Sequence, residues 1–502
     1  MSTPTKQEDT HAPADAIDPG RLPPLRTRPL PDAVPLRKMI GPSIMLAGLA
    51  LGSGEFILWP YITYQSGFVF FWACLLGVTT QYFINMEITR WSLATGESAI
   101  TGFARLSKHW AWLFLVLNVV PWMIPAWAKG AAEITSWLVW GPTGVGEGAV
   151  ESRHVTALSI AGLFICGAVL TAGKVVYETV ERIQLVLVSL ILVLVVVLAA
   201  FLVRADAVVA QLTGAVSFGA LPDAGALTPL LLLGALAFAG VGGTMNLGQS
   251  NYVKDKGYGM GRYIGRITSP ITGQTEAISE VGYHFPHDEE NLARWRAWWR
   301  AAGTEHFVSF FLTCIACLVL LTLISYSIFY DADGSRIDGA AQYGNNMSFV
   351  WGEAVAIENR LGTAARVLFL VMGVCILLTT EFGVLDAATR ISTDIVKVNW
   401  LQGSEQWSES RLYYAILWGT ILLGTAILLV GDQKVRAFDL FKFTAAMNGG
   451  VMFVYSALLL RINRYRLPEA IRMGTFRTVM MVWAVAFFGF FAVWAAWDVV
   501  GR

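Results

Sequence analysis

A carboxylate stands in the middle of an apolar segment near the N-terminus. Residues 41–67 read GPSIMLAGLALGSGEFILWPYITYQSG, where Glu55 directly follows Gly52, Ser53 and Gly54. A charged side chain at the bilayer centre costs about 2.5–3.5 kcal/mol on insertion scales, so an acid at this depth usually has a function. Glu55 could ligate a cation, carry a proton or pair with a buried cation. The glycines could open the backbone towards a ligand or let a neighbouring helix approach closely.

A second glycine-rich interruption lies in an apolar segment five segments later, where residues 240–246 read GVGGTMN. Interruptions at corresponding places in two halves of a chain are the best sequence pointer to a transporter site between unwound helices. Unwound backbone survives in a membrane only where protein or a water-filled cavity faces it. The two interruptions therefore predict two unwound helices facing one substrate site. The candidate binding residues of the second one are Gly240, Gly243, Thr244, Met245 and Asn246.

Other apolar segments contain ionisable or polar side chains. Lys129 and Glu133 are four residues apart, so they share a helix face and could neutralise each other. Lys442 lies one helical turn from Asp439, and it could either face the site or form an internal pair. Glu133 and Glu55 are the predicted proton carriers, because buried carboxyl groups can hold a proton near neutral pH. Two further accessory candidates are Glu381 and Asn448.

Membrane helices must position these side chains. The chain has 502 residues, of which 55% are hydrophobic and only 14% are charged. The apolar residues form blocks of about twenty, the length that crosses ~30 Å of hydrocarbon. The sequence therefore predicts an all-α integral membrane protein with eleven spans. They are expected at 39–64, 68–92, 111–139, 154–172, 179–203, 228–252, 306–330, 364–388, 412–431, 437–460 and 476–498.

The distribution of charge predicts the orientation. Lys and Arg total 36, as do Asp and Glu, so net charge gives no indication of a nucleic-acid partner. Basic residues gather before the first span, in the 253–305 loop and after the tenth span. The positive-inside rule then predicts a cytoplasmic N-terminus and an outside C-terminus, in an inner or plasma membrane. The expected partners are the lipid bilayer, protons and a small ion or solute.

Four regions are expected along the chain. Residues 1–36 contain eight of the 18 prolines and should form a disordered cytoplasmic tail. Residues 37–203 and 204–460 should each form a five-helix repeat, and 461–502 an eleventh helix. Within the 253–305 loop, the run RWRAWWR at 294–300 predicts a helix lying at the headgroup interface.

Both interruptions lie in segments that resemble the Nramp family of metal-ion transporters. Residues 41–67 are similar to its first helix, which begins Gly-Pro and breaks at Asp-Pro-Gly-Asn. GVGGTMNLGQSNYVKDKGYG, which begins at Gly240, is similar to its sixth helix, which breaks at Met-Pro-His-Asn-Leu. Span number and order also match over 39–498. The resemblance implies a LeuT-type fold: a 5+5 inverted repeat with helices one and six unwound, plus an eleventh helix, serving proton-coupled transport by alternating access.

The resemblance also shows which family residues are missing. Gly52 stands where the family has its metal-binding Asp, and Glu55 where it has Asn. Gly243 stands where it has its metal-binding Met. The soft thioether that would favour Mn and Fe is therefore absent from its usual place. The chain would be a divergent member, without the family's two metal-site motifs.

Other positions are partly retained. Thr244 and Met245 replace the family's Pro and His, whereas Asn246 is kept. In the third span, AAEI at 131–134 is similar to the family's Ala-Glu pair, so the resemblance implies that Glu133 belongs to the proton pathway. It also implies that Arg411 matches an arginine of that pathway.

Two transporter hypotheses follow, neither with a resident cofactor. In the first, the cargo is a divalent metal cation held by Glu55 and Asn246, and oxygen ligation would favour Mg or Mn. In the second, the pocket binds a small organic solute such as an amino acid or amine. Lys442 would favour the second hypothesis if it faced the site, because a buried ammonium repels a divalent cation. The resemblance places metal transport first.

A membrane-embedded enzyme and a solute sensor are the remote alternatives. The sequence contains no His-Glu-x-x-His run, and its six histidines include none that stands in mid-span with a partner. The enzyme hypothesis therefore has no catalytic set to support it.

Overall fold

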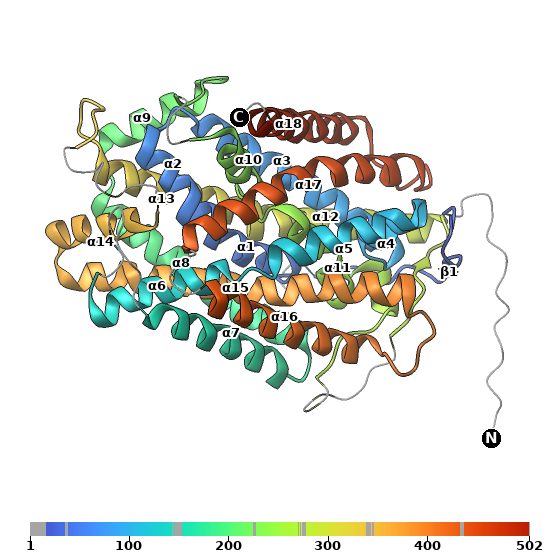
Figure 1. The fold of residues 1–502 in the computed structure, drawn as a ribbon. Coiled ribbons are helices and arrows are strands. Elements are labelled where there is room, and N and C mark those ends of the chain that lie inside the picture. The colour runs from blue at the N-terminus through green and yellow to red at the C-terminus, as the bar shows by residue number, and fades with distance from the viewer. Residues whose placement is uncertain are drawn as a thin grey trace, which may run out of the picture.

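The structure, a computed structural model, is a bundle of long helices with one small sheet (Figure 1). The sheet pairs β1 (Arg26–Thr27) in parallel with β2 (Tyr283–His284). The structure describes residues 17–500 except 36–38, 143–144, 146–152, 224–226, 270, 272, 274–277, 338–342, 344–345 and 432–435.

The first half of the chain contains the following helices. The first membrane segment comprises α1 (Pro42–Ala50), η2 (Leu51–Leu58) and α2 (Trp59–Ser66), and the next elements are α3 (Phe71–Thr95), α4 (Ala99–Leu106), α5 (Lys108–Trp122), α6 (Ala126–Trp140), α7 (His154–Ala172), α8 (Val176–Leu202) and α9 (Ala205–Val216).

The second half of the chain begins with the broken segment of α10, η3 and α11. It contains α10 (Pro229–Ala237), η3 (Gly243–Leu247), α11 (Gly248–Asp255), η4 (Gly259–Tyr263), α12 (Glu289–His306), η5 (Phe307–Leu312), α13 (Thr313–Phe329), α14 (Ser348–Leu361), α15 (Thr363–Trp400), α16 (Glu409–Gly431), α17 (Ala437–Tyr465) and α18 (Thr475–Val500).

Each predicted span coincides with helix in the structure. Within the described residues, nine helical segments are long and apolar enough to cross a membrane. The other two predicted spans are α3, which carries Glu87 and Arg90, and the broken segment from α10 to α11. The structure is thus that of an all-α membrane protein, as the block lengths indicate.

The RWRAWWR run differs from the prediction. It lies in α12, which continues into η5 and α13 instead of lying separately at the headgroups. Trp295 and Trp298 are 5% and 1% exposed, and the Trp298 indole donates a hydrogen bond to the Pro31 carbonyl at 2.7 Å. Both side chains are therefore covered by protein, Trp298 by the N-terminal segment and Trp295 by Phe285.

The N-terminal segment is ordered from residue 17 to residue 35, contrary to the predicted disorder. Leu30 is 1% exposed, and Arg105 donates to the carbonyls of Pro19 and Pro23 at 2.8 and 3.0 Å. The proline-rich composition indicated disorder because it does not reveal these distant partners. Residues 1–16 of the predicted tail lie outside the described residues.

The basic segments meet at one end of the bundle, as the sequence predicts. β1 pairs with β2 of the 253–305 loop, and Asp18 forms an ion pair with Arg466 after the tenth span. We call this the basic end. α9 and α14 lie at the opposite end (Figure 1).

Candidate functional site

The sixth membrane segment is broken between α10 and η3. Gly240, Gly242 and Gly243 have φ values of 135°, 81° and 55°, a region that other residues rarely adopt. A Cβ on Gly243 would also lie 1.7 Å from Oδ1 of Asn448 on α17. Glycine is therefore required here both by the backbone and by the neighbouring side chain, and the predicted interruption is confirmed.

Gln81 of α3 satisfies the backbone groups that this break frees. Its Nε2 lies 3.3, 2.8 and 3.1 Å from the carbonyl oxygens of Leu236, Ala237 and Ala239. Its Oε1 accepts from the N–H of Gly242 at 3.4 Å. Buried carbonyls without partners would cost about 1–3 kcal/mol each, so one side-chain amide makes the break tolerable inside the bundle.

The first membrane segment is not unwound, and here the prediction is wrong. Residues 51–58 form a π-helix, in which the N–H of Trp59 bonds to the carbonyl of Gly54 five residues earlier. Such wide turns keep the backbone hydrogen-bonded, are rare, and often occur at functional sites. The side chain of Ser53 lies outside the described part of the structure.

The glycines of this π-helix instead permit close packing. A Cβ on Gly54 would lie 1.4 Å from the carbonyl oxygen of Phe238, in the turn where helix six breaks. A Cβ on Gly52 would lie 2.2 Å from Oγ1 of Thr380 on α15. The two interrupted segments do meet, but through contact of their backbones.

Glu55 turns towards α3 and α13. The side chain is 0% exposed and its electrostatic neighbours are the thiols of Cys74, Cys314 and Cys317. The Cys314 thiol lies beside it without full hydrogen-bond geometry, and neither carboxyl oxygen has a hydrogen-bond partner among the described residues. The structure therefore does not bring Glu55 into one ligand set with Asn246 and Thr244.

Uncharged polar side chains gather at the helix-six break. The Thr244 hydroxyl accepts from Nε1 of Trp122 at 2.8 Å and donates to Oδ1 of Asn118 at 2.9 Å. The Thr244 N–H donates to Asn448, and Asn246 donates to the hydroxyl of Tyr455 at 2.9 Å. Met245 is 0% exposed and belongs to the apolar core.

Aromatic rings flank these polar groups. Trp122 stacks on Trp127 with centroids 5.4 Å apart, and Phe238 lies 6.1 Å from Trp122. Phe441 lies 5.5 Å from Trp127. The site therefore combines amide and hydroxyl groups with aromatic walls. The sequence analysis did not identify Gln81, Asn118, Trp122 and Tyr455 as site residues. Each has a side chain that can hydrogen-bond within a predicted membrane span, and that feature could have identified it.

The other predicted residues lie in three different settings. Lys129 and Glu133 are both buried on α6, and Glu381 accepts from the N–H of Ala128 in the first turn of that helix at 3.1 Å. Lys442 pairs with Asp439 at 2.7 Å and its side chain is 35% exposed, so the internal pair is confirmed.

Arg411 is exposed, unlike the pathway arginine that the resemblance implies. Its guanidinium donates to the carbonyl of Gln406 at 3.1 Å near the start of α16.

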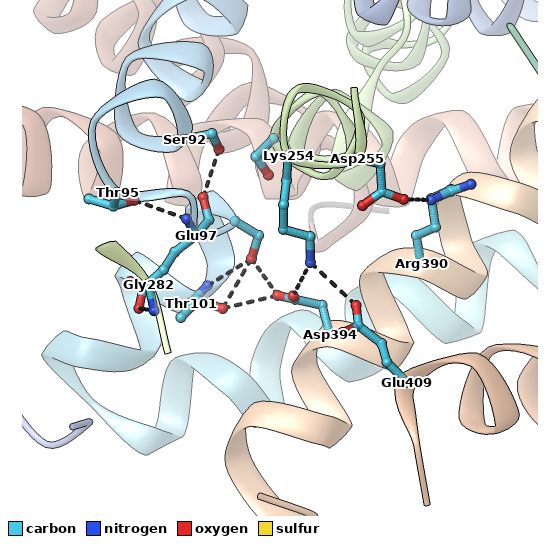
Figure 2. Close-up of polar contacts among 12 residues, drawn as sticks. Ser92, Thr95, Glu97, Thr101, Lys254, Asp255, Gly282, Arg390, Asp394 and Glu409 are labelled. Carbon is cyan, nitrogen blue, oxygen red and sulfur yellow. Dashed lines mark hydrogen bonds and ion pairs between the residues drawn. The ribbon is translucent and has the colours of Figure 1, made fainter. Parts of the chain in front are cut away.

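A buried charged network closes the basic end (Figure 2). Lys254 of α11 lies 3.0 Å from Asp394 of α15 and 3.4 Å from Glu409 of α16. Asp394 also accepts from the Thr101 hydroxyl at 3.0 Å. Arg390 forms an ion pair with Asp255 next to Lys254. These pairs fasten the second half of helix six to the neighbouring helices.

Aromatic side chains close the opposite end. Tyr61 of α2 lies 4.7 Å from Phe438 of α17 and 5.6 Å from Phe349 of α14, measured between ring centroids. Tyr64 lies 4.7 Å from Phe329. The helix-six break is thus covered on both sides, by charge pairs at one end and by rings at the other.

Among the described residues, no group of three or more His, Cys, Asp or Glu side chains is arranged to hold a metal ion. Of the two expected ligands, Glu55 lies beside the Cys314 thiol, and Asn246 donates to the Tyr455 hydroxyl at 2.9 Å.

No protein-family model matches the chain, and no curated protein matches it by sequence. Solved structures do match. A mutant of the manganese transporter of Eremococcus coleocola has a TM-score of 0.68 at 13% identity, over 93% of this chain and 89% of that one. The same transporter in complex with an aromatic bis-isothiourea compound gives 0.67 at 12% identity, over 97% and 91%.

The structure of MhsT in complex with L-phenylalanine also matches, with a TM-score of 0.55 at 12% identity over 90% of this chain and 98% of that one. At these identities the likeness shows a shared fold. The chain is therefore an all-α membrane protein whose fold is similar to those of a manganese transporter and of a protein in complex with an amino acid.

Proposed function

We propose that the chain is a secondary transporter that carries a small polar organic solute through a site at the helix-six break. The uncharged hydrogen-bonding set around Thr244 carries this proposal. In transporters with paired repeats, discontinuous helices bind the substrate near the bilayer midplane. The fold that the chain shares with the manganese transporter and with MhsT supports this proposal.

The chemistry of the break favours an organic solute over a metal. Its polar side chains include two asparagines, Asn118 and Asn448, the Thr244 hydroxyl and the Trp122 indole. Mg and Mn prefer anionic oxygens among their ligands, whereas amides and an indole recognise the donors and acceptors of a small molecule. Stacked tryptophans provide the apolar wall that such pockets usually have.

A divalent metal cation is the second candidate cargo. The observation that favours it is the likeness to a manganese transporter, which has a higher TM-score than the likeness to MhsT. In this alternative, Glu55 would have to turn from the thiols of α3 and α13 towards Asn246.

Transport would require the two closed ends to open in turn. Opening the basic end separates Lys254 from Asp394 and Glu409, while opening the other end separates Tyr61 from Phe438. We propose that the helix-one and helix-six elements rock against α15 and α17 in this cycle. Glu55 is the proposed proton carrier, because its buried carboxyl group has no hydrogen-bond partner within the described structure.

Uptake into proteoliposomes tests the function. With an inward proton gradient, wild-type protein should accumulate one of a panel of labelled amino acids and amines, and Glu55→Gln should uncouple this uptake from the gradient. Trp122→Phe, which keeps the ring but loses the hydrogen bond to Thr244, should raise KM. Trp112→Phe is the matched control, since Trp112 lies on the same helix and is 55% exposed.

The same vesicles distinguish the candidates. Accumulation of Mn²⁺ or Mg²⁺ that no amino acid or amine inhibits would replace the organic-solute proposal with metal transport. If neither class is accumulated by protein that remains folded, the transporter proposal itself is wrong.

A further inference from the structure

An open groove of about 880 Å³ runs along the outside of the bundle near the basic end. It lies between Trp110, early in α5, and the last turns of α17. Phe453 and Tyr465 on α17 are 38% and 77% exposed along it. The groove is far larger than a water site and is within the size range of sites for organic ligands.

The lining of the groove changes character along α17. Phe453, Val454 and Leu458 form its apolar part, whereas Arg461 and Arg466 lie towards the helix end. The rise of 1.5 Å per residue places Arg466 about 20 Å along the axis from Phe453. Apolar surface followed by cations is the order in which a phospholipid presents its acyl chain and its phosphate.

Aromatic residues mark the boundary between the two parts. Trp110 and Tyr465 line the groove beside the arginines. Tryptophan and tyrosine concentrate at the level of lipid headgroups, where one side of the ring is apolar and the other is wet. The cationic part of the groove therefore lies at headgroup depth.

The arginines at the groove mouth favour binding of an anion. Arg461 is exposed and has neither an ion pair nor a hydrogen bond within the described structure. Arg466 forms an ion pair with the Asp18 carboxylate, so an anionic oxygen is already held at this mouth. Lys108, also exposed, begins α5 next to the groove.

We propose that this groove binds an anionic phospholipid from the leaflet at the basic end. One acyl chain lies along Phe453 and Leu458, and the phosphate lies between Arg461 and Arg466. The positive-inside orientation would place this end in the cytoplasmic leaflet, where basic pockets between helices bind anionic headgroups. The proposal concerns the outer face of α17, not the helix-six break, and does not depend on which substrate is transported.

Native mass spectrometry of detergent-solubilised protein tests the preference. With equal additions of phosphatidylglycerol and phosphatidylcholine of matched chains, wild-type protein should retain the phosphatidylglycerol. Arg461→Gln should lower that retention about fivefold, the effect of one cation near an anionic headgroup. Arg461→Lys should keep most of it. Arg300→Gln is the matched control, because Arg300 is an exposed arginine of α12 at the same end.

Location is tested separately with phosphatidylglycerol that carries a photoreactive diazirine on its acyl chain. Crosslinked peptides should contain residues 453–460, and glycerol phosphate without chains should not compete. Equal retention of both lipids, crosslinks only elsewhere, or full competition by glycerol phosphate would overturn the proposal. So would a dimer in which the same groove is buried against a second copy.

Discussion

Replacing Gly54 with alanine tests the close contact between helix one and the helix-six break. The added Cβ would lie 1.4 Å from the carbonyl oxygen of Phe238, and such atoms essentially never approach within 3.0 Å. The two backbones would have to separate by about 1.6 Å. Because the obstacle is a backbone atom, no rotation of a side chain relieves it.

The expected loss of stability is large for a single methyl group. Overpacking a tight interior costs about 1–3 kcal/mol and occasionally more, and a backbone-to-backbone clash belongs at the upper end, so we expect ~3 kcal/mol. Gly54 does not have a positive φ, so the penalty contains no backbone strain. The separation would also pull the break away from Gln81, so uptake should fall with stability.

Gly419→Ala is the control for this prediction. A Cβ on Gly419, within α16, meets nothing within 4 Å, and Ala is favoured over Gly in a helix by about 0.5–1 kcal/mol. Thermal unfolding in detergent should therefore show a lower midpoint for Gly54→Ala and an unchanged or higher one for Gly419→Ala. If both variants unfold at the wild-type temperature and Gly54→Ala is fully active, the contact between the two segments does not exist as described.

Three further predictions concern individual contacts. Gln81→Leu leaves the carbonyls of Ala237 and Ala239 without their side-chain donor, whereas Leu236 keeps the N–H of Ala239, so it should cost at least ~2 kcal/mol in thermal unfolding and abolish uptake; wild-type stability would contradict the capping role. Lys254→Met breaks a buried ion network and should cost about 3–5 kcal/mol, whereas Lys256→Met, whose side chain is 24% exposed, should cost less; equal losses would contradict this difference. Partial burial raises the pKa of Glu280, but hydrogen bonds from Lys397 and the Gly403 N–H outweigh it and hold that pKa below its ordinary value of 4.5. The pair therefore stabilises the protein above pH 4.5, and this contribution is lost as the pH falls below 4.5 through the lowered pKa. Glu280→Gln should therefore lose less stability in acid than the wild type does, when the unfolding midpoint is measured against pH. An unchanged fall of the midpoint below pH 4.5 would refute the role of the Glu280–Lys397 pair.

Much of the fold could be predicted because it depends on local composition. Blocks of about twenty apolar residues define spans whatever their neighbours are, and each predicted span coincides with helix. The break near Gly243 was also predictable, since three glycines in four residues weaken a helix locally. The gathering of basic segments at one end likewise follows from where cations occur along the chain.

The candidate site was predicted less well, because its residues depend on distant partners. Gln81 is one of several polar residues in α3, and nothing local indicates that it faces the carbonyls of Leu236 and Ala237. Arg411 matched a family position by its place in the chain, yet it is exposed. The ordered segment 17–35 was missed for the same reason, since its prolines give no sign of Arg105.

Helix one shows why glycine alone could not decide between opening and packing. An unwound turn and a close helix contact both favour glycine, because glycine has no Cβ. The two can be told apart only by the atom that lies where the Cβ would be. At Gly54 that atom is the Phe238 carbonyl oxygen, and the π-helix keeps the surrounding backbone bonded. Helix one therefore does not offer a substrate the free carbonyls of an unwound turn.

The polar groups of the site must then come largely from other helices. Asn448 of α17 places its oxygen 1.7 Å from where a side chain on Gly243 would begin. The sequence resemblance implies a metal-binding methionine at that position in the family, and in this chain the amide of Asn448 occupies the space that such a side chain would enter. An amide at this position is what the proposed organic-solute function requires, because it can recognise the donors and acceptors of a small molecule.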